Sequence, residues 1–276
     1  MDRIVSVSTM AYDGYSLETA LDELAALGVR HVEPASVDKV FQHLVEADFC
    51  EARATWLRDQ LASRRLSCVS LSAHMDLGRP DSIERFTRRL EFARAIGARI
   101  VNTIAGPLAA AEGFRRNIPA IGARAADLGL TVALENHGDL VDREGQILHV
   151  IREIGMPAVR VNYDTGNAWY YSKGGLDPVK ELEQVASVVA HVHLKSPRID
   201  DGLLRWVALG EGVLDLAAAA RVLRERLPGV PVSYELSPRQ RSRDFEPRWR
   251  APEVPPAAEL RETIRRSLTA LERVLS

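Results

Sequence analysis

Short runs of apolar and β-branched residues recur along the chain, separated by segments with the hydrophobic spacing of amphipathic helices. The runs start at intervals close to the roughly 30 residues that one strand and its crossover helix require. Strands are expected at residues 4–8, 29–33, 67–73, 99–104, 131–135, 159–164, 188–194 and 230–235. The pattern therefore predicts a series of βα units.

The segments between the strands carry signals that start and stop helices. Ser16 is a typical cap residue, and Asp81 and Glu84 have the spacing of a capping box. Helices are expected over 16–28, 81–97, 118–128, 214–226 and 257–275. Three of the predicted helices stop at a glycine shortly before the next strand, where a left-handed residue commonly ends a helix; these residues are Gly28, Gly97 and Gly129.

Strict alternation of strands and helices is typical of a parallel sheet, and eight units favour closure into a barrel. A doubly wound dinucleotide-binding sheet should carry a glycine-rich fingerprint after its first strand, and residues 9–15 (TMAYDGY) carry none. We therefore predict an α/β fold, a single (β/α)8 TIM barrel over residues 1–276. Residues 237–256, rich in Pro and Arg, are expected to form a long loop that covers a pocket or contacts another subunit.

Composition narrows the classes of function. The chain has 36 Lys and Arg against 38 Asp and Glu, and this net charge of −2 argues against a nucleic-acid partner. No stretch approaches 18 uncharged apolar residues, and the first ten residues lack the apolar core of a signal peptide. Cys50 and Cys68 are expected to be free, buried thiols in a reducing compartment. We therefore expect a cytoplasmic protein without a membrane partner, and a homodimer or homotetramer is compatible with the sequence.

Four chemically active side chains stand at the ends of four consecutive predicted strands: Glu135, Asp164, His193 and Glu235. Catalytic groups of such barrels come from this end of the strands. Three carboxylates and an imidazole in one place repel and desolvate one another unless a cation joins them. Three oxygen donors and one nitrogen donor suit Mn²⁺, Mg²⁺, Co²⁺ or Fe²⁺, while Zn²⁺ usually takes more His or Cys. We therefore predict one divalent metal ion, with Mn²⁺, Mg²⁺ or Co²⁺ favoured.

Other side chains near the same strand ends are candidates for binding a substrate, although each alone is also compatible with a surface or core role. Lys195 follows His193 by two residues in a chain with four lysines, and Arg198 could hold an acidic or phosphorylated group. Aromatic rings such as Trp169 can pack against the C–H faces of a sugar. His191 is expected to have a supporting or core role. The predicted substrate-binding residues are Glu33, His74, His137, Asn167, Trp169, Lys195 and Arg198.

The segments ALENHGD, YDTGNAW, HVHLKS and YELSP, together with LGEGVLD, resemble the xylose-isomerase-like sugar isomerase and epimerase superfamily over nearly the whole chain. The resemblance implies the same four metal ligands, with Glu135 and Glu235 also serving as acid and base on opposite faces of a sugar. Asn167 stands where many relatives have a histidine, and Val141 lies where ketose 3-epimerases carry another glutamate. These departures leave the substrate open, and the three-metal site of the related AP endonucleases is unsupported.

The resemblance implies a metal-dependent isomerase or epimerase of a small keto-sugar or keto-polyol. A divalent ion that binds a hydroxyketone would make the adjacent C–H acidic enough for a carboxylate to remove its proton. The proton can return to the other face or to the neighbouring carbon, or a hydroxyl can leave. The alternative is therefore a lyase that dehydrates an inosose or a 3-dehydroshikimate-like ring. A third hypothesis is a non-catalytic carbohydrate-binding barrel.

Overall fold

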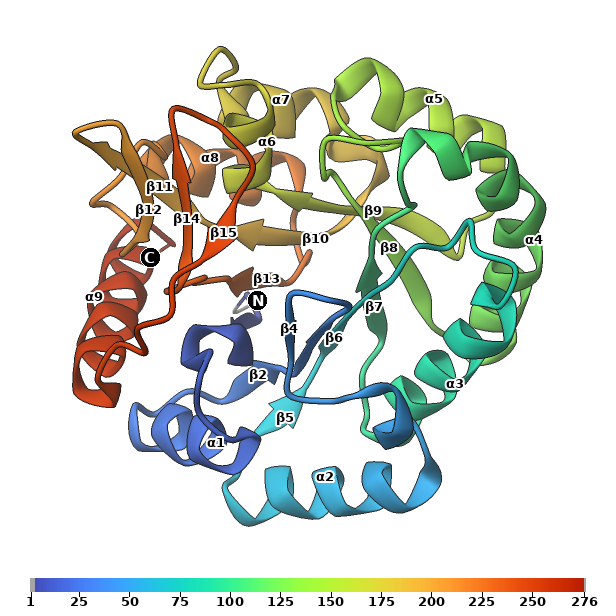
Figure 1. Ribbon diagram of the computed structural model, residues 1–276, viewed down its shortest axis with the longest axis horizontal. Coiled ribbons are helices and arrows are strands. Elements are labelled where there is room, and N and C mark those ends of the chain that lie inside the picture. Colours follow the sequence, from blue (N-terminus) through green and yellow to red (C-terminus); the bar gives the residue numbers. More distant parts are fainter. Residues whose placement is uncertain (1–2, 276) are drawn as a thin grey trace.

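The computed structural model describes residues 3–275, and its central parallel sheet closes on itself as a barrel (Figure 1). β13 pairs with both β10 and β1, which joins the last part of the sheet to the first. β2 and β3 follow one another at the second position of the barrel, and β5 and β6 follow one another at the third. β2 pairs with β5, and β3 pairs with β6. The barrel strands are β1 (Val5–Ser8), β2 (His31–Glu33), β3 (Ala35–Val37), β5 (Ser67–Cys68), β6 (Ser70–His74), β7 (Ile100–Thr103), β8 (Thr131–Glu135), β9 (Val159–Asp164), β10 (Val189–Leu194) and β13 (Val232–Tyr234). The predicted α/β barrel is confirmed.

The helices surround the barrel and pack their apolar faces against it (Figure 1). They are α1 (Leu17–Ala26), α2 (Glu51–Ser63), α3 (Ser82–Ala95), α4 (Ala111–Asp127), α5 (Glu144–Ile154), α6 (Thr165–Tyr171), α7 (Pro178–Val185), α8 (Leu216–Arg226) and α9 (Ala257–Leu275). Short 3-10 turns occur at Thr9–Tyr12, Glu46–Asp48, Leu108–Ala110 and Ala186–Val188. Ser16 caps α1 as predicted, since its hydroxyl accepts a hydrogen bond from the Thr19 amide at 3.1 Å. The predicted glycines have the expected left-handed conformation, with φ of 76°, 88° and 66° at Gly28, Gly97 and Gly129.

One predicted capping bond and one predicted helix start are wrong. Asp81 makes no side-chain cap bond to α3, because its carboxylate turns to Arg79 at 3.1 Å and Arg85 at 3.6 Å. α4 begins at Ala111, well before the expected residue 118, and continues through Pro119. A proline fits the first turn of a helix, so it favours a start nearby, but here the helix tolerates it in the interior.

The segment 237–256 contains two strands where only an irregular loop was expected. β14 (Gln240–Arg243) pairs with β12 (Leu203–Val207) and with β15 (Trp249–Arg250), and β12 also pairs with β11 (Ser196–Asp200). This four-stranded antiparallel sheet joins the segments that follow β10 and β13. A remaining short strand, β4 (Phe41–Gln42), pairs with β3 beside the second barrel position. Such pairing between distant segments leaves no periodic signal in the sequence.

Both cysteines are free and Cys68 is buried, as expected, but the expected burial of Cys50 is wrong, because this residue is exposed just before α2. Within residues 3–275, no helix combines the length and the apolar character needed to cross a membrane.

Candidate active site

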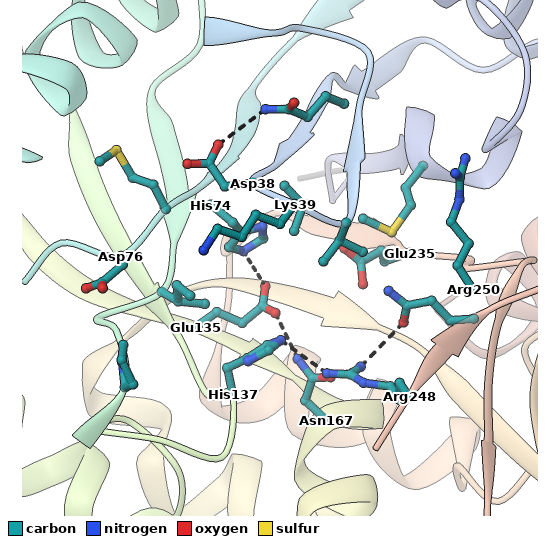
Figure 2. Close-up of a pocket in the computed structure, with 18 of the residues that line it drawn as sticks. Asp38, Lys39, His74, Asp76, Glu135, His137, Asn167, Glu235, Arg248 and Arg250 are labelled. Atoms are coloured by element: carbon teal, nitrogen blue, oxygen red, sulfur yellow. Dashed lines mark hydrogen bonds and ion pairs between the residues drawn. The ribbon is translucent and has the colours of Figure 1, made fainter. Parts of the chain in front are cut away.

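A pocket of about 1420 Å³ opens at the C-terminal ends of the barrel strands. Glu135, the last residue of β8, and Glu235, which follows β13, both line it (Figure 2). Asp164 and His193 come from β9 and β10, the two strands between them, and are fully buried. The barrel therefore places two carboxylates at the pocket surface, with a third carboxylate and an imidazole buried on the intervening strands.

The four predicted metal-binding side chains come together around one nitrogen of His193. Its Nδ1 lies 3.0 Å from Glu135 Oε2 and 3.6 Å from Glu235 Oε1. The same nitrogen is 3.9 Å from Asp164 Oδ2. Burial alone would lower the pKa of His193, but the surrounding carboxylates, Glu33 first among them, raise it well above its usual value. The geometry brings the four groups together, and their role as ligands stays a prediction.

Glu33, at the end of β2, holds the opposite nitrogen of the same ring. Its Oε1 lies 2.8 Å from His193 Nε2, which leaves Nδ1 turned toward the other carboxylates. Burial would raise the pKa of Glu33, but His193 lowers it to about 2. Glu33 does not line the pocket, so its predicted contact with substrate is corrected to an orienting role inside the barrel. Its Oε2 accepts hydrogen bonds from Ser70, Asn102 and Ser233.

Asp164 has one oxygen with a hydrogen bond and one without. Oδ1 accepts a hydrogen bond from the backbone N–H of Asn167 at 2.8 Å and so caps α6, whereas the buried Oδ2 has no hydrogen-bond partner. Burial raises the pKa of this carboxyl to about 7, and the nearby Glu135 adds to the effect while Lys195 opposes it. A buried carboxylate oxygen without a donor is costly unless a cation accompanies it.

The donor set fits a divalent cation. An oxygen of Glu135, an oxygen of Asp164 and a nitrogen of His193 all lie within 4.8 Å of one another. Four buried carboxylates at this centre face three basic side chains, His74, His193 and Lys195, so full ionisation of these groups leaves a formal charge of 3 − 4 = −1. Carboxylate oxygens with one imidazole suit Mg²⁺, Mn²⁺ and related ions. The unpartnered Asp164 oxygen and the excess of negative charge both favour such an ion.

Lys195 lines the pocket beside Glu235, near where the sequence placed it. Its Nζ lies 2.5 Å from Glu235 Oε2 and 3.8 Å from Asp164 Oδ2. The ammonium also stands 4.6 Å from the ring centroid of Trp206, a contact that the sequence did not predict. A Cβ on Gly166 would lie 2.6 Å from this ring and 2.9 Å from the Lys195 side chain. The glycine of the DTGN motif is therefore needed for close packing.

Polar neighbours hold Glu135 in a fixed orientation. His74 Nε2 lies 3.1 Å from its Oε2, and Asn167 donates to its Oε1 at 2.8 Å (Figure 2). Asn162, in β9, donates to Oε2 at 2.8 Å and also contacts His193. Burial would raise the pKa of Glu135, but His74 and His193 lower it well below its usual value. Asn162 was missed by the sequence analysis because it sits inside its strand and not at the strand's C-terminal end.

His137 lines the pocket, as does Asn167, and both contact Arg248 of the segment 237–256. Burial, together with Arg248, lowers the pKa of His137 to about 3, so the ring is neutral. Tyr171 completes this group, with its hydroxyl 3.1 Å from His137 Nδ1. Arg248 was not predicted, because its participation depends on how the antiparallel sheet folds over the barrel.

Three further predicted positions lie away from the pocket surface. Trp169 packs against Phe245, with 5.2 Å between the ring centroids, and Arg198 lies on β11, where it pairs with Asp200 at 3.0 Å. Their positions therefore do not support the predicted contacts with substrate. His191 is fully buried, 2.9 Å from Asn162 Oδ1, in agreement with a supporting role.

A family model described as a xylose isomerase-like TIM barrel matches residues 21–269. The chain belongs to this family. A search of curated proteins found no significant match.

Several solved structures have a similar fold. D-psicose 3-epimerase, solved in the presence of D-fructose, is 15% identical with a TM-score of 0.74, and the match covers 99% of both chains. A probable 3-DHS dehydratase of Bacillus anthracis is 17% identical with a TM-score of 0.71, and 98% of each chain is covered. A xylose isomerase-like barrel protein of Mycobacterium smegmatis in complex with magnesium is 17% identical with a TM-score of 0.71, covering 99% of this chain and 98% of the other. At such identities the likeness shows the fold alone.

Proposed function

We propose that this protein is a divalent-metal-dependent isomerase or epimerase of a small keto-sugar or keto-polyol. The observation that carries the proposal is the position of two pocket-lining glutamates on either side of the buried Asp164 and His193. Glu135, Asp164, His193 and Glu235 would hold the ion, which when bound would polarise a carbonyl and an adjacent hydroxyl of the substrate.

The two glutamates differ in how they are held, which suits different proton-transfer roles. Glu135 is kept ionised by His74 and His193, so it is ready to accept a proton from carbon. Glu235 receives a hydrogen bond from the Lys195 ammonium at its Oε2, so a proton is held at that position. A substrate between them could lose a proton to one carboxylate and regain one from the other.

A lyase is the second candidate, because the Lys195 ammonium could also supply the acid that this reaction requires. This ammonium lines the pocket and is in contact with Glu235. An acid at this point could protonate a departing hydroxyl once the carbon proton is removed. The same donor set thus serves either outcome, and the substrate decides between them.

A product screen separates these functions. The protein would be incubated with ketoses, inososes and 3-dehydroshikimate in the presence of Mn²⁺, Mg²⁺ or Co²⁺, and the products followed by mass spectrometry. A product of unchanged mass supports the isomerase or epimerase, and loss of one water with a new conjugated absorbance supports the lyase. Absence of any conversion that depends on Glu135 and Glu235 would leave the third hypothesis, a non-catalytic carbohydrate-binding barrel.

A further inference from the structure

Arg248 brings a positive charge to the pocket wall from the turn between β14 and β15. Its guanidinium donates to Asn167 Oδ1 at 3.2 Å and to Gln240 Oε1 at 3.5 Å. It also donates to His137 Nε2 at 3.1 Å and to the hydroxyl of Tyr171. None of these four acceptors is a carboxylate.

The other arginines at the pocket surface differ from Arg248 in having acidic partners. No carboxylate in the part of the chain that the structure describes lies within 4.0 Å of the Arg248 guanidinium. A guanidinium without a carboxylate partner keeps an uncompensated positive charge, which attracts an anion. The paired arginines are Arg79 with Asp81, Arg85 with Asp38 and Glu46, and Arg250 with Asp13.

Arg248 is also held in position beside the reacting groups. Its guanidinium carbon lies 4.8 Å from the ring centroid of Tyr170 and 5.2 Å from that of Tyr171. Asn167 connects it to Glu135, since Asn167 donates to Glu135 Oε1 at 2.8 Å and accepts from Arg248 (Figure 2). Only the side chain of Asn167 therefore lies between the Arg248 guanidinium and the carboxylate of Glu135, which is proposed to transfer protons.

We propose that the substrate carries a carboxylate, and that Arg248 binds this group and thereby selects a small keto acid with a hydroxyl beside its carbonyl. This inference rests on the proposed function, because it places the acid group of the substrate one side chain away from Glu135, which is proposed to transfer protons. A planar guanidinium matches a carboxylate in a two-pronged geometry. Phosphate sites in such barrels commonly use a helix N-terminus after the last strands, whereas Arg248 stands between two strands.

Binding and exchange measurements with matched ligands test the proposal. The ligands are neutral ketoses of four to six carbons, keto acids of the same lengths such as 5-keto-D-gluconate, and D-fructose 6-phosphate, each with Mn²⁺ present. Calorimetry gives the dissociation constant, and proton NMR in D₂O gives the rate of C–H exchange. The proteins compared are the wild type, Arg248→Gln, Arg248→Lys and the control Arg79→Gln, which removes a paired arginine from the same pocket.

We expect the wild type and Arg79→Gln to bind a keto acid roughly 10- to 100-fold more tightly than the matched ketose, as a charge-assisted hydrogen bond would give. Arg248→Gln should lose this preference without losing neutral-ketose binding, and Arg248→Lys should keep part of it. The proposal would be overturned if Arg248→Gln kept the preference for a keto acid over the matched ketose. It would also be overturned if the wild type showed no such preference, which includes the case in which it binds neither ligand. An Arg248-dependent preference for the phosphate would overturn the carboxylate assignment. Binding preference without C–H exchange of any ligand would refute the proposed function and leave the inference about Arg248 supported.

Discussion

Asp164→Asn separates two effects of the proposed metal site: the loss of stability that its buried charge causes in the ion-free protein, and the gain of stability when a divalent ion binds. The substitution retains an oxygen that can accept the Asn167 amide hydrogen and so keeps the cap of α6. It removes the charge from Oδ2, which is buried without a hydrogen-bond partner. We therefore expect the variant to fold as the wild type does, to gain stability in the absence of divalent ions, and to bind them poorly.

The size of both effects follows from the structure. An unsatisfied buried polar group costs about 1–3 kcal/mol, and more when it is charged, although the attraction between Lys195 and Asp164 at 3.8 Å offsets part of this. For 276 residues the entropy of unfolding is about 0.6 kcal/mol/K, so a gain of 1–3 kcal/mol raises Tm by roughly 2–5 °C. An ion at 100 times its Kd adds about 2.7 kcal/mol, or about 5 °C, to a protein that binds it.

The assay is thermal unfolding of the chelator-treated proteins with and without Mn²⁺. The wild type should gain about 5 °C at saturating Mn²⁺, and Asp164→Asn should start higher and gain less than about 1 °C. Asp76→Asn is the matched control, because Asp76 also lines the pocket but its carboxylate binds the Gly78 amide. If Asp164→Asn lowered the Tm of the ion-free protein or kept the full Mn²⁺ response, the assignment of its Oδ2 to a cation would be wrong.

Three further predictions test the surrounding structure. Glu33→Gln should weaken Mn²⁺ binding roughly 10- to 100-fold in calorimetry, because Glu33 orients the His193 ring; an unchanged affinity would contradict that role. Gly166→Ala should lower the free energy of unfolding in urea by about 1–3 kcal/mol, since the new methyl group would meet the Trp206 ring, whereas Gly145→Ala has open space and should be neutral or stabilising. Burial lowers the pKa of His43 to about 4, so the unfolded chain takes up a proton that the folded protein does not; stability should fall by up to about 3 kcal/mol from pH 6.5 to pH 4. His43→Gln should make this part of the pH profile less steep, and an unaltered profile would show that His43 does not contribute.

The barrel and the convergence of the four central side chains could be predicted from sequence because both depend on local pattern and strand order. Glu135 and Asp164 end their strands, so a correct strand assignment suffices to place them at one end of the barrel. Glu33 also ends its strand, but pattern alone could not show that its carboxylate turns inward to His193 and away from the pocket.

Residues from the long segments could not be placed because their positions depend on pairing between distant parts of the chain. Arg248 reaches the pocket only because β14 pairs with β12, although α8 and the barrel strand β13 lie between these two strands in the sequence. Arg198 sits on the same antiparallel sheet but is directed to Asp200. Neither outcome has a signature in composition or spacing, so a strand-end rule assigned Arg198 and overlooked Arg248.

Solvent-deuterium incorporation into a ketose or keto acid tests the central claim most directly. With Mn²⁺, the wild type should exchange the C–H beside the carbonyl, as followed by proton NMR in D₂O. Removing the ion with a chelator, or introducing Glu135→Gln or Glu235→Gln, should abolish that exchange while the fold remains intact. Exchange that continues in both glutamate variants, or that proceeds equally well without a divalent ion, would contradict the account.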